Sequence, residues 1–232
     1  NFAEAWSNKG NVLRVMGRAE ESLQTYKKAI ELNPQSPASH SNYLMSLHYT
    51  EGIDRQTIYD ETVAWDEKFS KGLKPSKITF KNDRDPKKKL RVGMLSNSFR
   101  KHPVGYMIVK AVENIDPEKV EWVIYSGVPK SKYDQISKRL YESSAHWHDI
   151  VGLPDKDIEK LMRKDQCDLM IDLSGHSDTG RLAIFCRRVA PVQVEWVGGL
   201  FDTSGLKEMD WIIGDDVEIP EGDEQWYTEQ VY

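Results

Sequence analysis

The chain of 232 residues lacks several features that would assign a protein to a class at once. It has only two cysteines, Cys167 and Cys186, which argues against a disulfide framework and favours a reducing compartment such as the cytoplasm. Its longest apolar runs, such as 169–171, are far shorter than the roughly 20 residues that cross a bilayer, so we expect no membrane partner. The net charge of −5 provides no basic field, so we expect no nucleic-acid partner either.

Two further absences concern binding motifs and the chain ends. The pattern Gly-x-Gly-x-x-Gly does not occur, so the chain lacks the usual glycine-rich loop that binds a dinucleotide. Asp83-Arg84-Asp85 has the spacing of an Asp-x-Asp metal motif, but it lies in a polar stretch rather than at a strand end, and we predict no metal site. A helical pattern is already running at Ala3 and the chain stops in a polar stretch, so we expect a fragment of a longer protein.

The first organised signal is a helical repeat. Gly10 lets two antiparallel helices approach closely, and Asn33-Pro34 stops the second of them. From Pro37 onward the pattern weakens, as expected of a terminal, capping repeat. One repeat cannot bury its own face, so we expect further repeats before residue 1. The positions that match the 34-residue tetratricopeptide pattern are Trp6, Gly10, Leu13, Tyr26, Ala29 and Pro34.

A break in composition divides the chain. A helical pattern over 55–71 is followed by a polar, charged stretch with two prolines, which is typical of a connector. We therefore predict three parts: the end of the repeat region with its capping helices over 1–73, a linker over 74–89, and an α/β lobe over 90–232.

After the linker the hydrophobic period changes to that of short strands separated by helices. Alternating strands and helices predict a doubly wound parallel sheet with right-handed crossovers. The usual order for six such strands, 3-2-1-4-5-6, opens a crevice at the carboxyl ends of strands 1 and 4. The predicted strands cover 90–95, 120–125, 147–151, 169–173, 192–197 and 211–213.

Two loops that face this crevice each carry one histidine. His102 follows strand 1 and His176 follows strand 4. Either side chain could be a general base or a hydrogen-bond donor to a phosphate, and for a single loop histidine a structural role is the alternative. Two histidines at one crevice favour function. A third loop with Gly198, Gly199 and Thr203 could approach an anion with its amides, or could simply be a tight turn.

Several segments of the chain resemble one family. Tetratricopeptide repeats followed by the segments named below are similar to the O-linked N-acetylglucosamine transferase family and its bacterial homologues. The resemblance covers nearly the whole chain. The segments are Leu90-Arg91-Val92-Gly93, His102-Pro103-Val104-Gly105-Tyr106, Asp172-Leu173-Ser174-Gly175-His176, Ala190-Pro191-Val192-Gln193-Val194, Trp196-Val197-Gly198, Met209-Asp210-Trp211-Ile212-Ile213 and Tyr227-Thr228-Glu229.

The resemblance implies a two-lobed glycosyltransferase of the GT-B type. Such an enzyme transfers a sugar, here expected to be N-acetylglucosamine from UDP-N-acetylglucosamine, to Ser or Thr of acceptor proteins that the repeat arm binds. Transfer proceeds with inversion, without a cofactor and without a catalytic metal. The resemblance places His102 and His176 in the active site. The residues expected to contact substrate are Pro103, Gly105, Gly175, Arg181, Gly198 and Thr203.

Two loops depart from the family pattern. The family commonly reads G-H-T-x-G-N-R where this chain has 175–181, and L-G-Y-P-x-T-T-G where this chain has 197–205. A related plant branch transfers fucose, so the donor sugar stays open. The second lobe, which in this fold makes most nucleotide contacts, is outside this chain, and we expect the fragment alone to be inactive. The alternative is a repeat-based binding scaffold with a degenerate, non-catalytic lobe.

Overall fold

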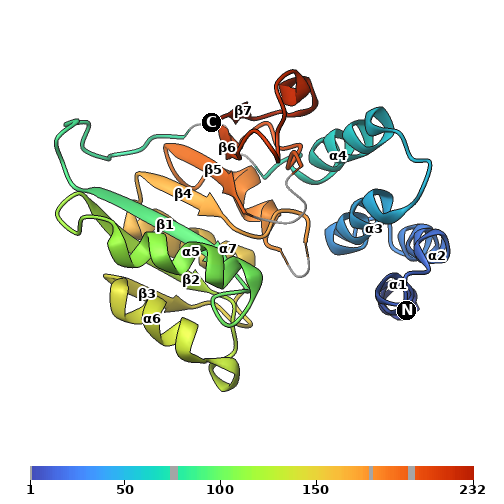
Figure 1. Ribbon diagram of the computed structural model, residues 1–232, viewed down its shortest axis with the longest axis horizontal. Coiled ribbons are helices and arrows are strands. Elements are labelled where there is room, and N and C mark those ends of the chain that lie inside the picture. Colours follow the sequence, from blue (N-terminus) through green and yellow to red (C-terminus); the bar gives the residue numbers. More distant parts are fainter. Residues whose placement is uncertain (1, 74–77, 178–179, 198–201) are drawn as a thin grey trace.

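The protein consists of a helical arm packed beside a parallel α/β lobe in the computed structural model (Figure 1). The structure describes residues 2–73, 78–177, 180–197 and 202–232. The arm comprises four helices: α1 (Ala3–Val15), α2 (Ala19–Leu32), α3 (Pro37–Tyr49) and α4 (Arg55–Phe69). This architecture confirms the predicted fold class, a helical repeat followed by a parallel-sheet lobe.

The arm begins with the predicted helical hairpin. A side chain at Gly10 would lie 2.5 Å from the Tyr26 ring, so only glycine permits this close approach of α1 to α2. The Tyr26 hydroxyl donates to Asn11 Oδ1 at 2.6 Å and closes the hairpin. Ser36 caps α3, with Pro37 in its first turn. The capping unit that the weakened pattern predicted is therefore helical.

The lobe contains one seven-stranded parallel sheet of order β3-β2-β1-β4-β5-β6-β7. The first six strands confirm the predicted order, with β1 beside β4. The two-residue β7 was not predicted, because its surroundings are polar. The strands are β1 (Leu90–Ser96), β2 (Val120–Ser126), β3 (His146–Asp149), β4 (Leu169–Asp172), β5 (Val192–Trp196), β6 (Trp211–Ile213) and β7 (Gln230–Val231).

Helices cover both faces of this sheet, because the apolar side chains of its strands alternate between two cores. Met94 of β1 packs with α5 (Pro103–Asn114) and α6 (Gln135–Ser143) on one face. The adjacent Leu95 packs on the other face with α7 (Asp155–Asp165) and the 3₁₀ helix η2 (Leu182–Arg187). Two shorter 3₁₀ helices are η1 (Lys130–Lys132) and η3 (Asp223–Trp226).

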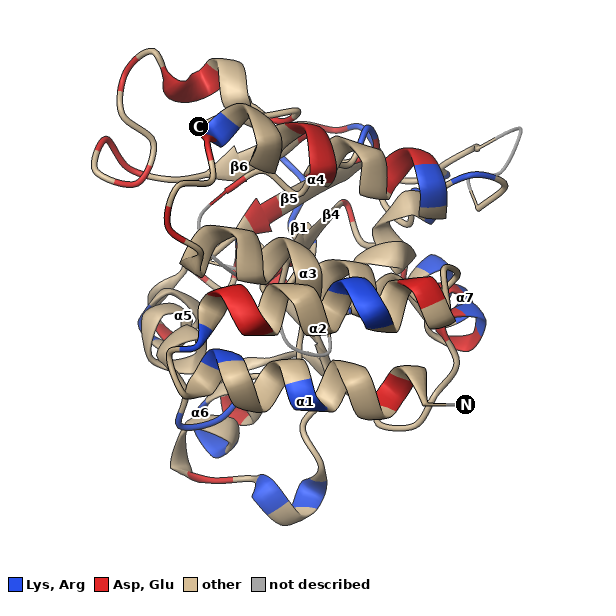
Figure 2. Cartoon of the chain, turned by 90° about the vertical axis from the view of Figure 1, so that its right-hand side faces the viewer, with Lys and Arg blue, Asp and Glu red and all other residues tan. Residues whose placement is uncertain are grey.

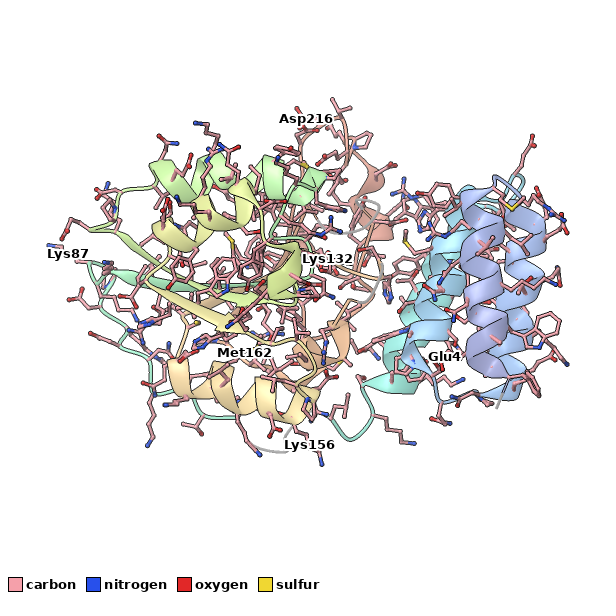
Figure 3. The ribbon with its side chains drawn as sticks, turned by 90° about the horizontal axis from the view of Figure 1, so that it is seen from below. Glu4, Lys87, Lys132, Lys156, Met162 and Asp216 are labelled. Carbon is pink, nitrogen blue, oxygen red and sulfur yellow. The ribbon has the colours of Figure 1, made fainter. Side chains whose placement is uncertain are left out.

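The arm and the lobe share one hydrophobic core. Leu47 of α3 and Trp65 of α4 are 2% and 3% exposed and belong to the same cluster as Phe185 and Leu206 of the lobe. Tyr43 and Phe69 pack against this cluster at its edge. These four arm residues therefore pack against the lobe, and Figure 3 shows α3 and α4 on the side of the arm that faces the lobe. The division into 1–73, 74–89 and 90–232 stays a prediction.

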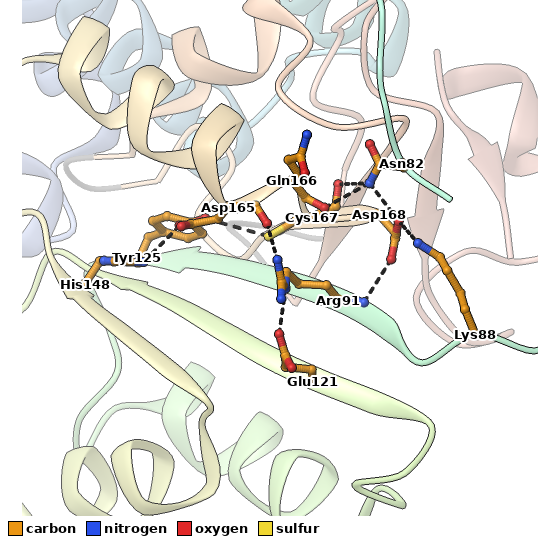
Figure 4. A network of polar contacts seen from close by, with 10 residues as sticks. All are labelled: Asn82, Lys88, Arg91, Glu121, Tyr125, His148, Asp165, Gln166, Cys167 and Asp168. Atoms are coloured by element: carbon orange, nitrogen blue, oxygen red, sulfur yellow. Dashed lines mark hydrogen bonds and ion pairs between the residues drawn. The ribbon is translucent and has the colours of Figure 1, made fainter. Parts of the chain in front are cut away.

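Residues 78–89, before β1, lie along the amino-terminal edge of the sheet, where a network holds them (Figure 4). Asp168, just before β4, accepts from Asn82 Nδ2 at 2.7 Å and from the Arg91 amide at 3.0 Å, and pairs with Lys88 at 2.5 Å. Arg91 in turn pairs with Glu121 of β2 at 2.6 Å. The linker is therefore tied to the segment just before β4, to which Arg91 of β1 is also bonded, at the edge opposite the crevice.

Charges of both signs are mixed along the first two helices of the arm. Figure 2 looks onto the arm, where acidic and basic positions are interspersed along α1 and α2, and α3 carries none. In the described part of the chain, no helix combines the length and the apolar character that a membrane span requires.

Candidate functional site

The carboxyl ends of β1, β4 and β5 face the arm, and the loops that leave them form the candidate site (Figure 1). The structure places His102 at the end of the loop after β1, His176 in the loop after β4, and Ser204 in the loop between β5 and β6. Both predicted histidines therefore lie on loops that follow the carboxyl ends of neighbouring strands, as the topology requires.

His102 is the N-cap of α5. Its Nδ1 accepts a hydrogen bond from the Val104 amide at 3.3 Å, and Pro103 occupies the first turn. Partial burial, and secondarily the charge of Arg100, lower the pKa of His102 below its usual value. The neutral ring with an accepting Nδ1 carries its proton on Nε2. His102 can therefore donate a hydrogen bond from Nε2 without first gaining a proton.

His176 has a different environment. Its Nε2 lies 2.8 Å from the Ser204 carbonyl oxygen, its Nδ1 lies 3.1 Å from the Ser41 hydroxyl of α3, and its ring meets Trp65 edge to face at 5.0 Å. Burial lowers the pKa of His176 to about 4, and the charge of His48 acts in the same direction. The imidazole is therefore neutral near pH 7, and both of its nitrogens are engaged.

Glycines shape the loops around both histidines. A side chain at Gly105 would lie 2.2 Å from the Arg100 carbonyl oxygen, so glycine lets the first turn of α5 pack under the loop after β1. Gly175 has a φ of +51° and donates its amide to Asp172 Oδ2 at 2.9 Å. The predicted substrate contacts Gly105 and Gly175 thus have a clear structural role, and their contact with substrate stays a prediction.

The remaining predicted contacts lie in varied places. Pro103 is exposed beside His102. Arg181 donates to Asp155 Oδ1 at 2.6 Å and to the Leu153 carbonyl at 2.9 Å, so α7 holds its guanidinium. Thr203 is buried and donates to Glu229 Oε2 at 2.6 Å. Gly198 lies outside the described residues.

Three buried carboxyl groups below these loops were missed by the sequence analysis. Asp172 and Glu195 are paired residues on β4 and β5, 0% and 2% exposed, and lie within hydrogen-bonding reach of each other. Glu229 accepts from the Ser204 amide at 2.9 Å and also from the hydroxyls of Ser204 and Thr203. The signal that could have found the first two is an acidic residue near the carboxyl end of a mostly apolar strand.

The electrostatics of the first two carboxyls differ from those of Glu229. Within the described residues no group donates to Asp172 Oδ1 or Glu195 Oε2. Burial raises the pKa of Asp172 to about 7, and burial together with the negative charges of Asp172 and Glu229 raises the pKa of Glu195. A proton kept by one of two adjacent buried carboxyls avoids placing two negative charges side by side, so we predict that this pair shares one proton near neutral pH.

A groove of about 670 Å³ separates the arm from the loop after β4. Amide side chains of α1 and α3 line one wall, and His176 and Arg181 line the other. Asn42 donates to the Ser7 hydroxyl at 3.1 Å, which keeps its amide on the groove side of the hairpin. The amides on the arm wall belong to Asn8, Asn11, Asn33 and Asn42.

Comparisons with known proteins agree with this geometry. A SPINDLY protein of Oryza sativa subsp. japonica, named a probable UDP-N-acetylglucosamine–peptide N-acetylglucosaminyltransferase, is 30% identical over 90% of this chain. A Caenorhabditis elegans UDP-N-acetylglucosamine–peptide N-acetylglucosaminyltransferase is 31% identical over 57% of it. The solved structure of a Thermobaculum terrenum O-GlcNAc transferase mutant superposes on 99% of the chain with a TM-score of 0.92 and 34% identity.

The chain spans 22% of the rice protein and 44% of the Thermobaculum chain. The tetratricopeptide repeat model matches residues 3–36, the hairpin of α1 and α2. The model of glycosyl transferase family 41 matches residues 36–232, which include the capping helices and the whole lobe. The chain therefore belongs to glycosyl transferase family 41.

Proposed function

We propose that the full-length protein is a protein O-glycosyltransferase. It transfers N-acetylglucosamine from UDP-N-acetylglucosamine to Ser or Thr of acceptor proteins, with inversion and without a metal ion. Family membership and the activities for which the relatives are named support this proposal. Two free, buried thiols, Cys167 and Cys186, support a location in the cytoplasm.

The observation that carries the proposal is the groove between arm and lobe. Its arm wall presents side-chain amides, each of which has both donors and an acceptor, as does the backbone of an extended peptide. An acceptor segment lying along this wall would pass the loop after β4, at the carboxyl edge of the sheet. The arm thus supplies affinity for the protein acceptor, and the lobe supplies the reacting edge.

His102 is the residue we assign to the chemistry. An Nε2–H that is present without protonation can stabilise charge that develops on the acceptor oxygen or the departing phosphate, and one such donor contributes roughly 10²- to 10³-fold to kcat. His176 has no free lone pair in this structure, which leaves His102 as the stronger candidate. The donor nucleotide is held mostly by a second lobe of the GT-B type, beyond this chain.

A second candidate function is a binding scaffold with a non-catalytic lobe. The observation that favours it is that several predicted substrate contacts are taken up internally. The guanidinium of Arg181 is bound by α7, and Thr203 points to Glu229 rather than into the groove. In this case the arm would still bind peptides, but no sugar would be transferred.

One assay separates the two functions. Full-length protein is incubated with a Ser-containing acceptor and either UDP-N-acetylglucosamine or a nucleotide-linked fucose, and product is followed by mass spectrometry. Transfer from the first donor supports the proposal, and transfer from the second corrects the sugar. Peptide binding without transfer from either donor supports the scaffold.

A further inference from the structure

His176 is the point at which three elements of the arm and lobe meet. Ser41 comes from α3, Trp65 from α4 and Ser204 from the loop between β5 and β6, and all three contact the one imidazole. Ser41 is 135 positions and Ser204 is 28 positions from His176 in the chain. A single loop side chain thus bridges the repeat arm to two loops of the lobe.

The directions of its two hydrogen bonds follow from chemistry. The Ser204 carbonyl oxygen can only accept, so Nε2 of His176 carries the proton and donates. The ring is neutral at neutral pH, so Nδ1 keeps a lone pair and accepts from the Ser41 hydroxyl. Each partner therefore has a defined role, and an edge-to-face contact with Trp65 fixes the ring plane.

The lobe side of this bridge is braced from below. Glu229 holds the amide and hydroxyl of Ser204, so the carbonyl that receives His176 is fixed in place. Asp172 holds the amide of Gly175, the residue before His176. A ring clamped by its own loop and by its acceptor loop is suited to hold a partner in one geometry.

The arm side of this contact determines where one wall of the groove lies. Ser41 lies in α3, the helix that also presents Asn42 to the groove, and His176 lines the opposite wall. Apolar packing of Leu47 and Trp65 joins arm and lobe but has little directionality. The Ser41–His176 contact supplies direction at the edge where the groove opens.

We propose that His176 is a positioning residue that latches α3 of the repeat arm to the lobe and so fixes the groove beside the reacting edge. This inference rests on the proposed function for what the groove binds, but not for the latch itself. His176 acts through the arm and does not exchange a proton with substrate.

The test combines two substitutions and a matched control. Ser41→Ala removes the arm hydroxyl, and His176→Phe removes both ring nitrogens but keeps a ring against Trp65. Ser46→Ala is the control, because Ser46 of the same helix is bonded to Ser22 of α2 at 2.7 Å, within the arm. Hydrogen exchange is measured on the full-length protein for 174–177 and 203–206.

The latch predicts that Ser41→Ala speeds exchange in both lobe segments by roughly 3- to 10-fold, the equivalent of one hydrogen bond. His176→Phe has at least the same effect, and the double variant adds little to it, because both substitutions break one contact. Ser46→Ala leaves the lobe segments unchanged. Exchange in the lobe that is unaltered by Ser41→Ala would overturn the proposal.

Activity gives a second readout. For a long protein acceptor, Ser41→Ala and His176→Phe should raise KM by a similar factor. If His176 instead takes part in chemistry, His176→Phe lowers kcat by about 100-fold or more while Ser41→Ala does not, and the proposal is wrong. The exchange experiment does not need turnover, so failure of the proposed function would not hide failure of the latch.

Discussion

The loop after β1 and the loop after β4 leave the same edge of the sheet, and each carries a histidine, yet their surroundings differ. His102 uses one ring nitrogen to cap its own helix and keeps Nε2 for another partner. His176 uses both nitrogens to join the arm to the lobe. Similar sequence surroundings thus place one histidine where it can meet a substrate and the other where it holds the molecule together.

The largest expected effect on activity is that of replacing His102, which tests this comparison of the two histidines. His102→Asn keeps an N-cap residue for α5 but removes Nε2, so in the full-length enzyme kcat should fall about 10²- to 10³-fold. Initial rates with a short Ser peptide measure this. The affinity of the arm for a long protein acceptor serves as control and should change less than about 2-fold.

The pH profile of the same enzyme separates donor from base. Because the pKa of His102 is lowered below its usual value, its ring is neutral at neutral pH and above, and a donor gives a flat kcat there. An ascending limb that disappears in His102→Asn would show that His102 is a base. A variant that keeps more than about half of wild-type kcat would remove His102 from the mechanism.

Trp65 tests whether the arm and lobe form one unit. Trp65→Ala should lower the free energy of unfolding by about 3–5 kcal/mol, because the ring is 3% exposed in the core that both regions share. Urea unfolding of the chain measures this, and Trp6→Ala, on the half-buried face of α1, should cost less. Two separate unfolding transitions in the wild type would contradict a shared core.

The buried carboxyl pair predicts a pH dependence of stability. The native pKa of Asp172 is raised to about 7, and that of Glu195 is also raised, so the native state binds more protons than the unfolded chain above about pH 4. Stability therefore falls as pH rises from about 4 to 7. Glu195→Gln removes one charge and should stabilise the protein at pH 8 by roughly 2–4 kcal/mol, with little change at pH 4.

Glu229 is the matched control for that pair. It accepts hydrogen bonds from Ser204 and Thr203, whereas Glu195 Oε2 receives none from the described residues. Glu229→Gln should therefore destabilise the protein at the pH where Glu195→Gln stabilises it. Thermal unfolding of both variants from pH 4 to 8 decides the point, and equal shifts of the same sign would contradict a shared proton.

The smallest expected effect concerns Arg181. Its partly exposed guanidinium joins the loop after β4 to Asp155 of α7, so Arg181→Ala should lower the free energy of unfolding by about 1 kcal/mol, and by less at high salt. Chemical unfolding at two salt concentrations measures this. A large rise in KM with unchanged stability would instead show that Arg181 contacts the substrate.

Much of the fold was predictable because its signals are local and periodic. The hairpin of α1 and α2 follows from Gly10 and Tyr26, and the strand order follows from alternating apolar runs and the chirality of crossovers. The two-residue β7 has no periodic signal. The segment after β4 forms the 3₁₀ helix η2 and not a full crossover helix, which apolar content alone does not distinguish.

The candidate site was predictable only in its location. The topology brings His102 and His176 to the carboxyl edge of the sheet. No sequence pattern near His176 predicts that its partner is Ser41, 135 positions earlier. Which nitrogen is engaged depends on contacts made by the finished fold. The predicted sharing of a proton by Asp172 and Glu195 likewise depends on strand register. The register of β4 and β5 pairs these two residues, which are 23 positions apart in the sequence.

The most direct test of the central contrast is kcat on a short Ser peptide, too short to depend on the arm, for His102→Asn and His176→Phe in the full-length enzyme. The two histidines are predicted to differ: the loss of kcat should be at least about tenfold larger for His102→Asn, because in the proposed mechanism only His102 meets the reacting atoms. Equal losses, or a larger loss for His176→Phe, would contradict this account.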